Sequence, residues 1–248
     1  MTTADRAARA WLEATAVLAG LQPDGYFHET AHGSAELVTG APSPQLNGVI
    51  GITRDPDAGE LAELAASPRL GAVSWAVQVR GDDPGDRIER IAAAHGRKHR
   101  RAVPFLLKEL SAADAHPVPG ARRLTGADSP VYRRTMAAGF EAPEEALALL
   151  TAPAVLDLPS MTGYLLEAGG VPVATGFGVL HGDLVGVFNI AVPPPFRRRG
   201  HGRAATAAVL SDAYARGART AFLRATPDGL PVYLRMGFHA AENWTVFS

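Results

Sequence analysis

The sequence has no cysteine among its 248 residues. Disulfide bonds, thiolate metal sites and a cysteine nucleophile are therefore excluded, because each of them needs a thiol. A chain without thiols fits a reducing compartment, so we expect a cytoplasmic protein. We also expect that the protein binds no metal.

Excess charge of one sign and long apolar runs are lacking as well. The 24 Lys and Arg residues nearly balance the 25 Asp and Glu residues, which gives a formal net charge of −1. No global field therefore draws the chain to nucleic acid or to an anionic membrane. No stretch approaches the ~20 apolar residues of a membrane span, and Arg6, Arg9 and Glu13 break the apolar pattern that a signal peptide needs. Neither nucleic acid nor a membrane is expected as a partner, and any basic site must be local.

The apolar residues that are present make up 47% of the chain, which suffices for a full core. A helix is predicted over residues 3–20, and the rest of the first half follows in the order β, β, α, β, α, β. After leading helices, the second half reads β, β, β, α, β, α, β, and residues 111–121 between the halves are typical of a linker. The sequence thus predicts an α/β (α+β) fold with a mixed, largely antiparallel sheet flanked by helices. We expect two tandem halves, residues 1–115 and 121–248.

A short basic loop stands out in the second half. Four arginines, one histidine and two glycines fall within Arg197–Arg203, between a predicted strand that ends at Val192 and a predicted helix over residues 202–217. Gly200 and Gly202 let the backbone approach a bulky ligand. The free N–H groups at the start of the helix favour an anion, and arginines add bidentate donors. The loop therefore predicts a phosphate or pyrophosphate site.

The kind of phosphate ligand is narrowed by the surroundings of the loop. Residues 200–205 match the dinucleotide fingerprint G-x-G-x-x-A, but seven residues separate its first glycine from the strand. The next strand ends without the acidic residue that holds a ribose, and the preceding strands read as antiparallel. An NAD(P)-binding protein is therefore the less favoured alternative, and coenzyme A remains as the phosphate-bearing ligand.

At this point the sequence resembles a known family. In residues Val192–Gly202, a strand that ends in valine, a proline-rich corner and the pattern Arg-x-x-Gly-x-Gly are similar to the signature of the GNAT N-acetyltransferases. A second family mark, Tyr-x-x-x-Gly-Phe, is present at Tyr233–Phe238. The resemblance covers about residues 121–248, and residues 1–115 share only the order of elements, as a degenerate repeat would. It implies an acyl-CoA N-acyltransferase-like fold and acetyl-CoA as the acetyl donor.

The resemblance also implies site residues. Three strand residues would pair with the pantetheine arm, the basic loop would surround the pyrophosphate, and a threonine would stand where many family members have asparagine at the start of the late helix. These expected coenzyme-binding residues are Ile190, Ala191, Val192, Arg197, Arg198, Arg199, Gly200, His201, Gly202, Arg203 and Thr226. We further expect Thr226 to cap the helix over residues 227–237.

Tyr233 is the expected catalytic residue. A phenol with a pKa near ~10 is protonated at neutral pH and can give its proton to a leaving thiolate. No general base is evident, although Glu167, His181 and Asp183 lie near the predicted central strands. The sequence thus predicts transfer of an acetyl group to the primary amine of a small molecule or peptide, by direct attack on the thioester. A non-catalytic acyl-CoA sensor is the alternative, and the acceptor and the oligomeric state stay open.

The first half has a different loop at the matching junction. Asp55, Asp57 and Glu60 occupy the stretch where a phosphate would have to bind, and no Gly-x-Gly is present. Because carboxylates repel an anion, we expect that the first half does not bind coenzyme A.

Overall fold

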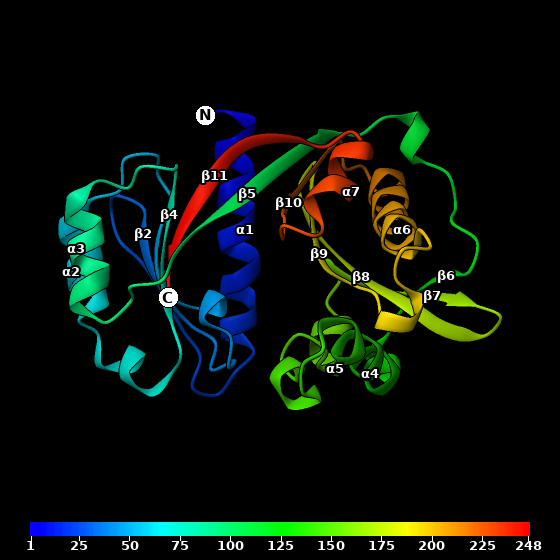
Figure 1. The fold of residues 1–248 in the computed structure, drawn as a ribbon, viewed down its shortest axis with the longest axis horizontal. Helices are drawn as coiled ribbons and strands as arrows, with labels where there is room; N and C mark the ends of the chain where they lie inside the picture. Colours follow the sequence, from blue (N-terminus) through cyan, green and yellow to red (C-terminus); the bar gives the residue numbers. More distant parts are fainter. The chain divides into compact units, whose positions relative to one another are not determined.

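Helices and strands alternate along the chain in nearly the predicted order (Figure 1). The first half has three strands before residue 58 where two were expected, because residues 26–38 form a hairpin of two strands, and the short strand at residues 121–123 was not expected. The computed structural model describes residues 1–248. The helices are α1 Thr3–Gly20, α2 Ala58–Ala65, α3 Asp86–Ala94, α4 Ser129–Phe140, α5 Pro153–Leu156, α6 His201–Ala215 and α7 Leu230–Arg235. The strands are β1 Tyr26–Glu29, β2 Ser34–Val38, β3 Asn47–Gly51, β4 Ala76–Arg80, β5 Arg100–Glu109, β6 Ala121–Arg123, β7 Met161–Ala168, β8 Val171–His181, β9 Leu184–Ala191, β10 Thr220–Arg224 and β11 His239–Phe247. None of the helices combines the length and the apolar character that a bilayer crossing requires.

The chain forms two compact units. Unit 1 comprises Met1–Phe105 together with Ala240–Ser248, and unit 2 comprises Leu106–His239. This division differs from the expected one, residues 1–115 and 121–248, because the C-terminal strand β11 pairs with β4 of unit 1. Its buried residues Trp244, Val246 and Phe247 explain the placement, since they complete the apolar interior of unit 1.

Unit 1 contains a sheet in which β1, β2 and β3 are antiparallel neighbours and β3 runs parallel to β4. Its core forms where the apolar faces of α2 and α3 meet the sheet, around Val49, Leu61, Val77 and Ile88. The helix α1 begins with a capping box, because the Thr2 hydroxyl accepts from the Asp5 N–H while the Asp5 carboxylate accepts from the Thr2 N–H. Alternating strands and helices with apolar inner faces thus give the layered arrangement that the sequence predicts.

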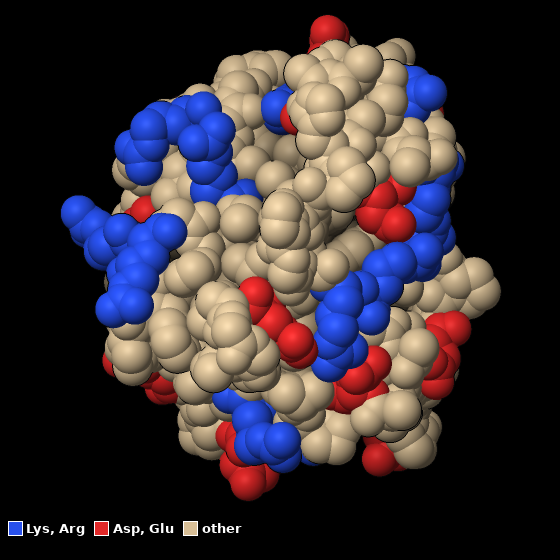
Figure 2. Space-filling view, turned by 90° about the vertical axis from the view of Figure 1, so that its right-hand side faces the viewer, with Lys and Arg blue, Asp and Glu red and all other residues tan.

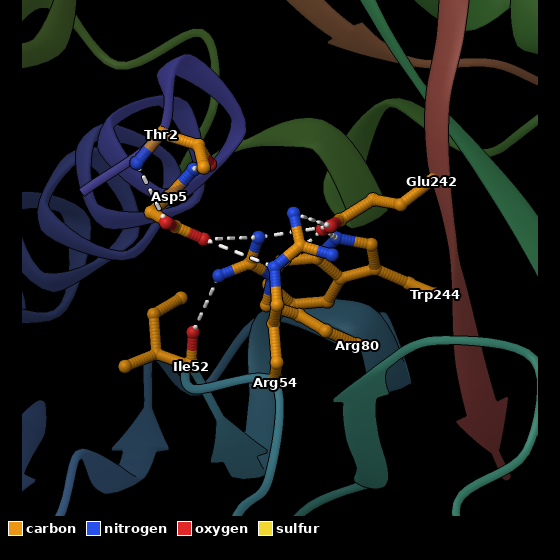
Figure 3. A network of polar contacts seen from close by, with 7 residues as sticks. All are labelled: Thr2, Asp5, Ile52, Arg54, Arg80, Glu242 and Trp244. Atoms are coloured by element: carbon orange, nitrogen blue, oxygen red, sulfur yellow. Dashed lines mark hydrogen bonds and ion pairs between the residues drawn. The ribbon is translucent and has the colours of Figure 1, made fainter.

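A buried ion cluster fixes β11 in unit 1 (Figure 3). The Arg80 guanidinium lies between the carboxylates of Glu242 and Asp5, and it also donates to the Ile52 carbonyl oxygen at 3.1 Å. Arg54 approaches both carboxylates at 3.4 Å. The hydrogen bond from the Thr2 N–H, and then hydrogen bonding and charge from Arg80, hold the pKa of Asp5 below its usual range, although burial opposes that shift. The Asp5 carboxylate therefore stays ionised at neutral pH, and the cluster links α1, β4 and β11 within this unit.

Unit 2 contains the antiparallel series β6, β7, β8 and β9, followed by β10 parallel to β9. Figure 1 shows α6 and α7 on one face of this sheet and α4 and α5 on the other. Two glycines of β8 let α6 approach, since a Cβ at Gly176 or Gly178 would lie 3.1 or 3.0 Å from the Val209 side chain. The mixed, largely antiparallel sheet with helices on its faces confirms the predicted fold class.

The two halves of the sequence repeat the same series of elements. Three antiparallel strands, a helix, a parallel strand, a helix and a last strand occur as β1 to β5 and again as β7 to β11. The last strands are exchanged, because β11 pairs with β4 and β5 is the neighbour of β10. Each series is therefore completed by a strand from the other half of the sequence.

Candidate active site

The strands β9 and β10 of unit 2 are paired only along the first part of β9, and they separate beyond it. Their parallel pairing runs from Thr220 opposite Leu184 to Phe222 opposite Gly186, whereas β9 continues to Ala191. The rings of Phe188 and Phe222 meet edge to face there, with centroids 6.2 Å apart. A Cβ on Gly186 would lie 2.4 Å from the Phe188 ring, so only glycine fits beneath it. The backbone of β9 from Val187 to Ala191 therefore has no β10 partner.

A β-bulge interrupts β9 in this unpaired stretch. Thr175 is opposite Ala191 and Phe177 is opposite Phe188, so that Asn189 and Ile190 together face the single residue Gly176. Asn189 adopts a left-handed conformation with φ 52°, which asparagine tolerates better than most residues. Sequence reasoning missed both Asn189 and the bulge, because no local pattern distinguishes this asparagine from an ordinary strand residue.

The basic loop leads from β9 into α6 through two left-handed residues. Arg198 has φ 63° and Gly200, the residue before the helix, has φ 85°. No side chain caps α6, and its first turn begins with His201 and Gly202. Its leading N–H groups therefore remain available, and with the positive end of the helix dipole they favour an anion.

The structure gives the four arginines of the loop two different roles. Arg197 turns toward the end of α4, where its guanidinium donates to the carbonyl oxygens of Val192 and Gly139 at 3.1 and 2.9 Å. It also pairs with the Glu141 carboxylate at 2.8 Å. Its side chain thus holds the loop, whereas we had expected it beside a pyrophosphate.

The other three arginines of the loop are exposed and have no carboxylate partner in the structure. They are Arg198, Arg199 and Arg203. Figure 2 shows one face of the molecule, on which Lys and Arg side chains gather in several separate groups. Some of these groups border Asp and Glu, and others have no carboxylate beside them. Local basic surfaces thus exist despite a net charge near zero.

Thr226 lies after the end of β10, but it does not cap α7. Its hydroxyl and its carbonyl oxygen both accept from the Gly229 N–H, at 3.2 and 3.1 Å, which closes a tight turn. The helix begins only at Leu230, with Pro231 in its first turn. The expected start at residue 227 is therefore wrong, because Asp228-Gly229 favours a turn over a helix.

Tyr233 lies on α7, and its ring packs edge to face against Phe238 with centroids 5.8 Å apart. Burial raises the pKa of the Tyr233 hydroxyl to about 12. The hydroxyl donates to no group of the protein, so it keeps its proton and remains available to a ligand. A Cβ added at Gly229 would lie 3.0 Å from the Tyr233 ring, so Gly229 packs closely against this ring.

The three candidate bases lie away from the split between β9 and β10. His181 and Asp183 belong to the hairpin that precedes β9, whereas the bulge at Asn189 and Ile190 is near the other end of the strand. Since β9 has 8 residues, its ends are about 23 Å apart at roughly 3.3 Å per residue. Glu167 pairs with Arg122 at 3.1 Å, near the hairpin between β7 and β8. None of the three is placed to accept a proton at the split.

A cavity of about 270 Å³ adjoins α6 on the side of the linker. Arg203, Ala207 and Leu210 line it from α6, and Met236 lines it from the end of α7. Opposite them lies the linker segment from Ala113 to Pro119. Arg203 thus belongs to both the basic loop and the lining of the cavity.

The matching junction in unit 1 differs in two respects. The strands β3 and β4 are paired to their ends, with Gly51 opposite Val79, so they do not separate as β9 and β10 do. The start of α2 is also occupied, because the Asp57 carboxylate accepts from the N–H groups of Gly59 and Glu60 at 2.7 and 3.0 Å. A carboxylate of the chain itself thus occupies the position that an anion would need.

The expectation that no metal is bound overlooks one spacing in the sequence. His28-Glu29-x-x-His32 matches the zinc pattern H-E-x-x-H, which requires a helix to bring both histidines to one face. In the structure, His28 and Glu29 belong to β1 and His32 to the turn after it. Glu29 pairs with Arg9, and His32 pairs with Glu60 at 2.8 Å. His28 and His32 therefore do not lie on one face of a helix, which the zinc pattern requires.

The model of the acetyltransferase (GNAT) family matches residues 130–238. No curated protein matches the sequence. Among solved structures, a GCN5-related N-acetyltransferase from Kribbella flavida is similar over 99% of this chain and 95% of its own, with 18% identity and a TM-score of 0.68.

Two further structures are similar over most of the chain. A GCN5-related N-acetyltransferase from Sphaerobacter thermophilus has 17% identity and a TM-score of 0.56, covering 96% of this chain and 90% of its own. A functionally unknown conserved protein from Staphylococcus epidermidis has 12% identity and a TM-score of 0.62, covering 92% and 94%. Identities this low show only that these structures share the fold. The assignment to a family rests instead on the family model. Residues 130–238 are thus an acetyltransferase domain of the GNAT family.

Proposed function

We propose that unit 2 binds acetyl-CoA and transfers its acetyl group to a primary amine by direct attack on the thioester. One observation carries this proposal. The end of β9 has no β10 partner, residues 192–200 form a basic loop after it, and α6 then begins without a side-chain cap. A pantetheine arm needs a slot lined by backbone groups, and a pyrophosphate needs backbone N–H donors. The stretch Val187–Ala191 supplies the first and the start of α6 supplies the second.

The loop and α6 would hold the phosphates. The N–H groups at the first turn of α6 face the anion, while Arg198, Arg199 and Arg203 supply positive charge without a carboxylate to compete for it. Arg197 would act indirectly, by fixing the loop to α4 through Glu141. The nucleotide end of the donor would occupy the cavity of about 270 Å³ beside Arg203.

The strand residues would hold the acetyl group. Ile190 belongs to the bulge, and Ala191 and Val192 follow it, where the backbone has no β10 partner. A backbone N–H here would donate to the thioester oxygen as negative charge develops on it, which lowers the barrier to attack. The amine nitrogen then bonds to the carbonyl carbon as the carbon–sulfur bond breaks.

Tyr233 would donate a proton, or a strong hydrogen bond, to the leaving sulfur. A pKa of about 12 makes the phenol a weaker acid than free tyrosine. The same dry surroundings would raise the pKa of the thiol of a bound donor. The difference between the pKa of Tyr233 and the pKa of that thiol would therefore become smaller when the donor binds. The proton that the amine loses would replace the one that Tyr233 gives, so that amide and free thiol are the products. Since no base lies at the split, the acceptor would arrive as a neutral amine.

The acceptor class would be a small molecule or a peptide with a primary amine. The rival function is a non-catalytic acyl-CoA sensor, which needs the same loop but no acid. A thiol-release assay with acetyl-CoA across a panel of small amines and peptides tests the proposal. We expect release that depends on the amine. Tight binding of acetyl-CoA without release from any amine supports the sensor instead, and binding of a nicotinamide nucleotide in place of acetyl-CoA contradicts both.

A further inference from the structure

Two buried hydroxyls lie at the bulge of β9. A bulge adds one residue that has no place in the regular ladder, so the carbonyl groups around it need other partners. The Tyr132 hydroxyl, from α4, donates to the Gly176 carbonyl oxygen at 3.3 Å. The Thr175 hydroxyl, from β8, donates to the Asn189 carbonyl oxygen at 2.8 Å. Each strand at the bulge thus has a carbonyl group bound by a side-chain hydroxyl.

Both hydroxyls are fully enclosed. Tyr132 and Thr175 have exposed fractions of 0% each, so neither can exchange its partner for water. Burial raises the pKa of Tyr132 above its ordinary value, and the Asn189 side chain, which hydrogen-bonds to it, opposes the shift only partly. Tyr132 therefore remains a neutral donor throughout the neutral range.

The residues of the bulge point to opposite faces of the sheet. Ile190 lies against α6, because its side chain is 3.9 Å from where a Cβ at Gly202 would be. Asn189 instead contacts Tyr132 of α4, which packs on the other face. The next residue, Ala191, meets α4 at Gly139, whose Cβ would lie 2.7 Å from that of Ala191. The bulge is therefore held between two helices as well as by two hydroxyls.

We propose that Tyr132 and Thr175 are positioning residues of the acetyl-transfer site, which fix the bulge so that the backbone at Asn189 and Ile190 meets the thioester carbonyl. This inference rests on the proposed function of unit 2. Neither side chain touches the donor or the acceptor. They act through the β9 backbone, whose position against a developing oxyanion matters because a misplacement of about 1 Å can lower a rate by about 100-fold.

The test compares matched hydroxyl deletions in unit 2. Tyr132→Phe and Thr175→Val remove the two hydroxyls with little change in volume. Tyr164→Phe and Thr135→Val are the controls, because Tyr164 bonds to Asp212 at 2.6 Å and Thr135 to Val131 of its own helix at 2.8 Å, both buried. We expect kcat to fall about 10-fold or more in the first pair. The KM for acetyl-CoA should stay within about threefold, and the controls should keep the kcat of the wild type.

Rescue and a second readout keep the outcome decisive. In contrast to Thr175→Val, the variant Thr175→Ser keeps a hydroxyl, and it should therefore retain most of the wild-type kcat. Titration with acetyl-CoA should shift the amide resonances of Asn189 and Ile190 in the wild type, and these shifts should be reduced in Tyr132→Phe and Thr175→Val. The inference is overturned if the first pair loses no more kcat than the controls and keeps the shifts.

The same experiment separates this inference from the proposed function. If the wild type binds acetyl-CoA but releases no thiol with any amine, acetyl transfer fails. The amide shifts then decide the role of the bulge by themselves, since reduced shifts support it and unchanged shifts overturn it. A wild type that binds no acetyl-CoA contradicts both proposals.

Discussion

The Arg80 guanidinium binds both carboxylate oxygens of Glu242, with nitrogen–oxygen distances of 2.7 and 2.8 Å. The two side chains are only 3% and 7% exposed, so the pair is shielded from water. Glu242→Gln would leave Arg80 with an incomplete set of partners in a dry site. We expect the free energy of unfolding to fall by about 3–5 kcal/mol, as for other buried pairs that lose one partner. Denaturant titration measures this change.

An exposed pair of the same unit serves as the control. Arg100 and Glu89 are 2.6 Å apart, but both side chains are more than 40% exposed. Glu89→Gln should therefore cost no more than about 1 kcal/mol, because water screens such a pair. Equal losses in the two variants would contradict the structural role given to Arg80 and Glu242.

The exchange of last strands predicts that residues 1–115 do not fold alone. This fragment lacks β11, and with it Trp244, which packs against Trp11 and Phe105 at centroid distances of 5.1 and 5.8 Å. Without that strand, β4 becomes an edge and the core is open. We expect no cooperative thermal transition from the fragment, as followed by circular dichroism.

Restoring the strand should restore folding. Residues 239–248 joined to the fragment through a flexible linker should give a cooperative transition, and the same fusion with Trp244→Ala should give a weaker one. A fragment that folds as well without β11 as with it would show that the strand is dispensable.

Much of this fold could be predicted from the sequence, for reasons that individual elements make plain. The helix over residues 3–20 has a strong apolar stripe, and the strands β7, β8 and β9 are separated by the glycine turns at Gly169-Gly170 and Gly182. The exchange of β5 and β11 could not be predicted, because it depends on which distant strand pairs with β4. Local patterns carry no information on that choice.

The candidate site was predictable in its loop but less so in its strand. Gly200 and Gly202 indicated a phosphate site, because the start of a helix without a side-chain cap can be recognised from the local sequence. The contacts of Arg197 could not be predicted, since its partners Gly139 and Glu141 are almost sixty residues away in the sequence. Tyr132 and Thr175 gave no signal, because a hydroxyl that bonds to a distant carbonyl group looks like any core residue.

His32 and Glu60 predict a measurable titration in unit 1. The Glu60 carboxylate, at 2.8 Å, raises the pKa of His32 above its ordinary value, and bonds from Thr30 and His32 lower the pKa of Glu60 to about 2. The stabilising effect of His32 is thus present at low pH and lost as pH rises through its raised pKa. That of Glu60 is present above its unfolded pKa and lost as pH falls toward 2. The pair is therefore most effective in mildly acidic solution.

Nuclear magnetic resonance titration of His32 tests this directly. We expect a pKa above the ordinary 6.5 in the wild type and a return toward that value in Glu60→Gln. Asp57, which adds a smaller raising effect, should matter less than Glu60 when it is replaced by asparagine. An unchanged His32 pKa in Glu60→Gln would contradict the assigned contact.

Tyr233→Phe separates an enzyme from a sensor. The variant keeps the ring that packs on Phe238 and loses only the hydroxyl, so folding and affinity for acetyl-CoA should be retained. Loss of a proton donor should lower kcat by about 100-fold or more. With a pKa of about 12, Tyr233 should produce no change in rate between pH 6 and 9 through its own titration. Unchanged turnover would remove Tyr233 from the mechanism.

The most direct test of the central claim is calorimetric titration of acetyl-CoA into Gly202→Asp and Gly202→Ala. A Cβ at residue 202 would meet Val192 at 3.5 Å, an ordinary contact, so both variants should fold. An aspartate in the first turn of α6 also favours the helix, but it places negative charge where the pyrophosphate would bind. We predict that Gly202→Ala binds acetyl-CoA within a few-fold of the wild type and that Gly202→Asp binds at least about 100-fold more weakly. Equal affinity in the two variants would contradict the assignment of the α6 N-terminus as the phosphate site.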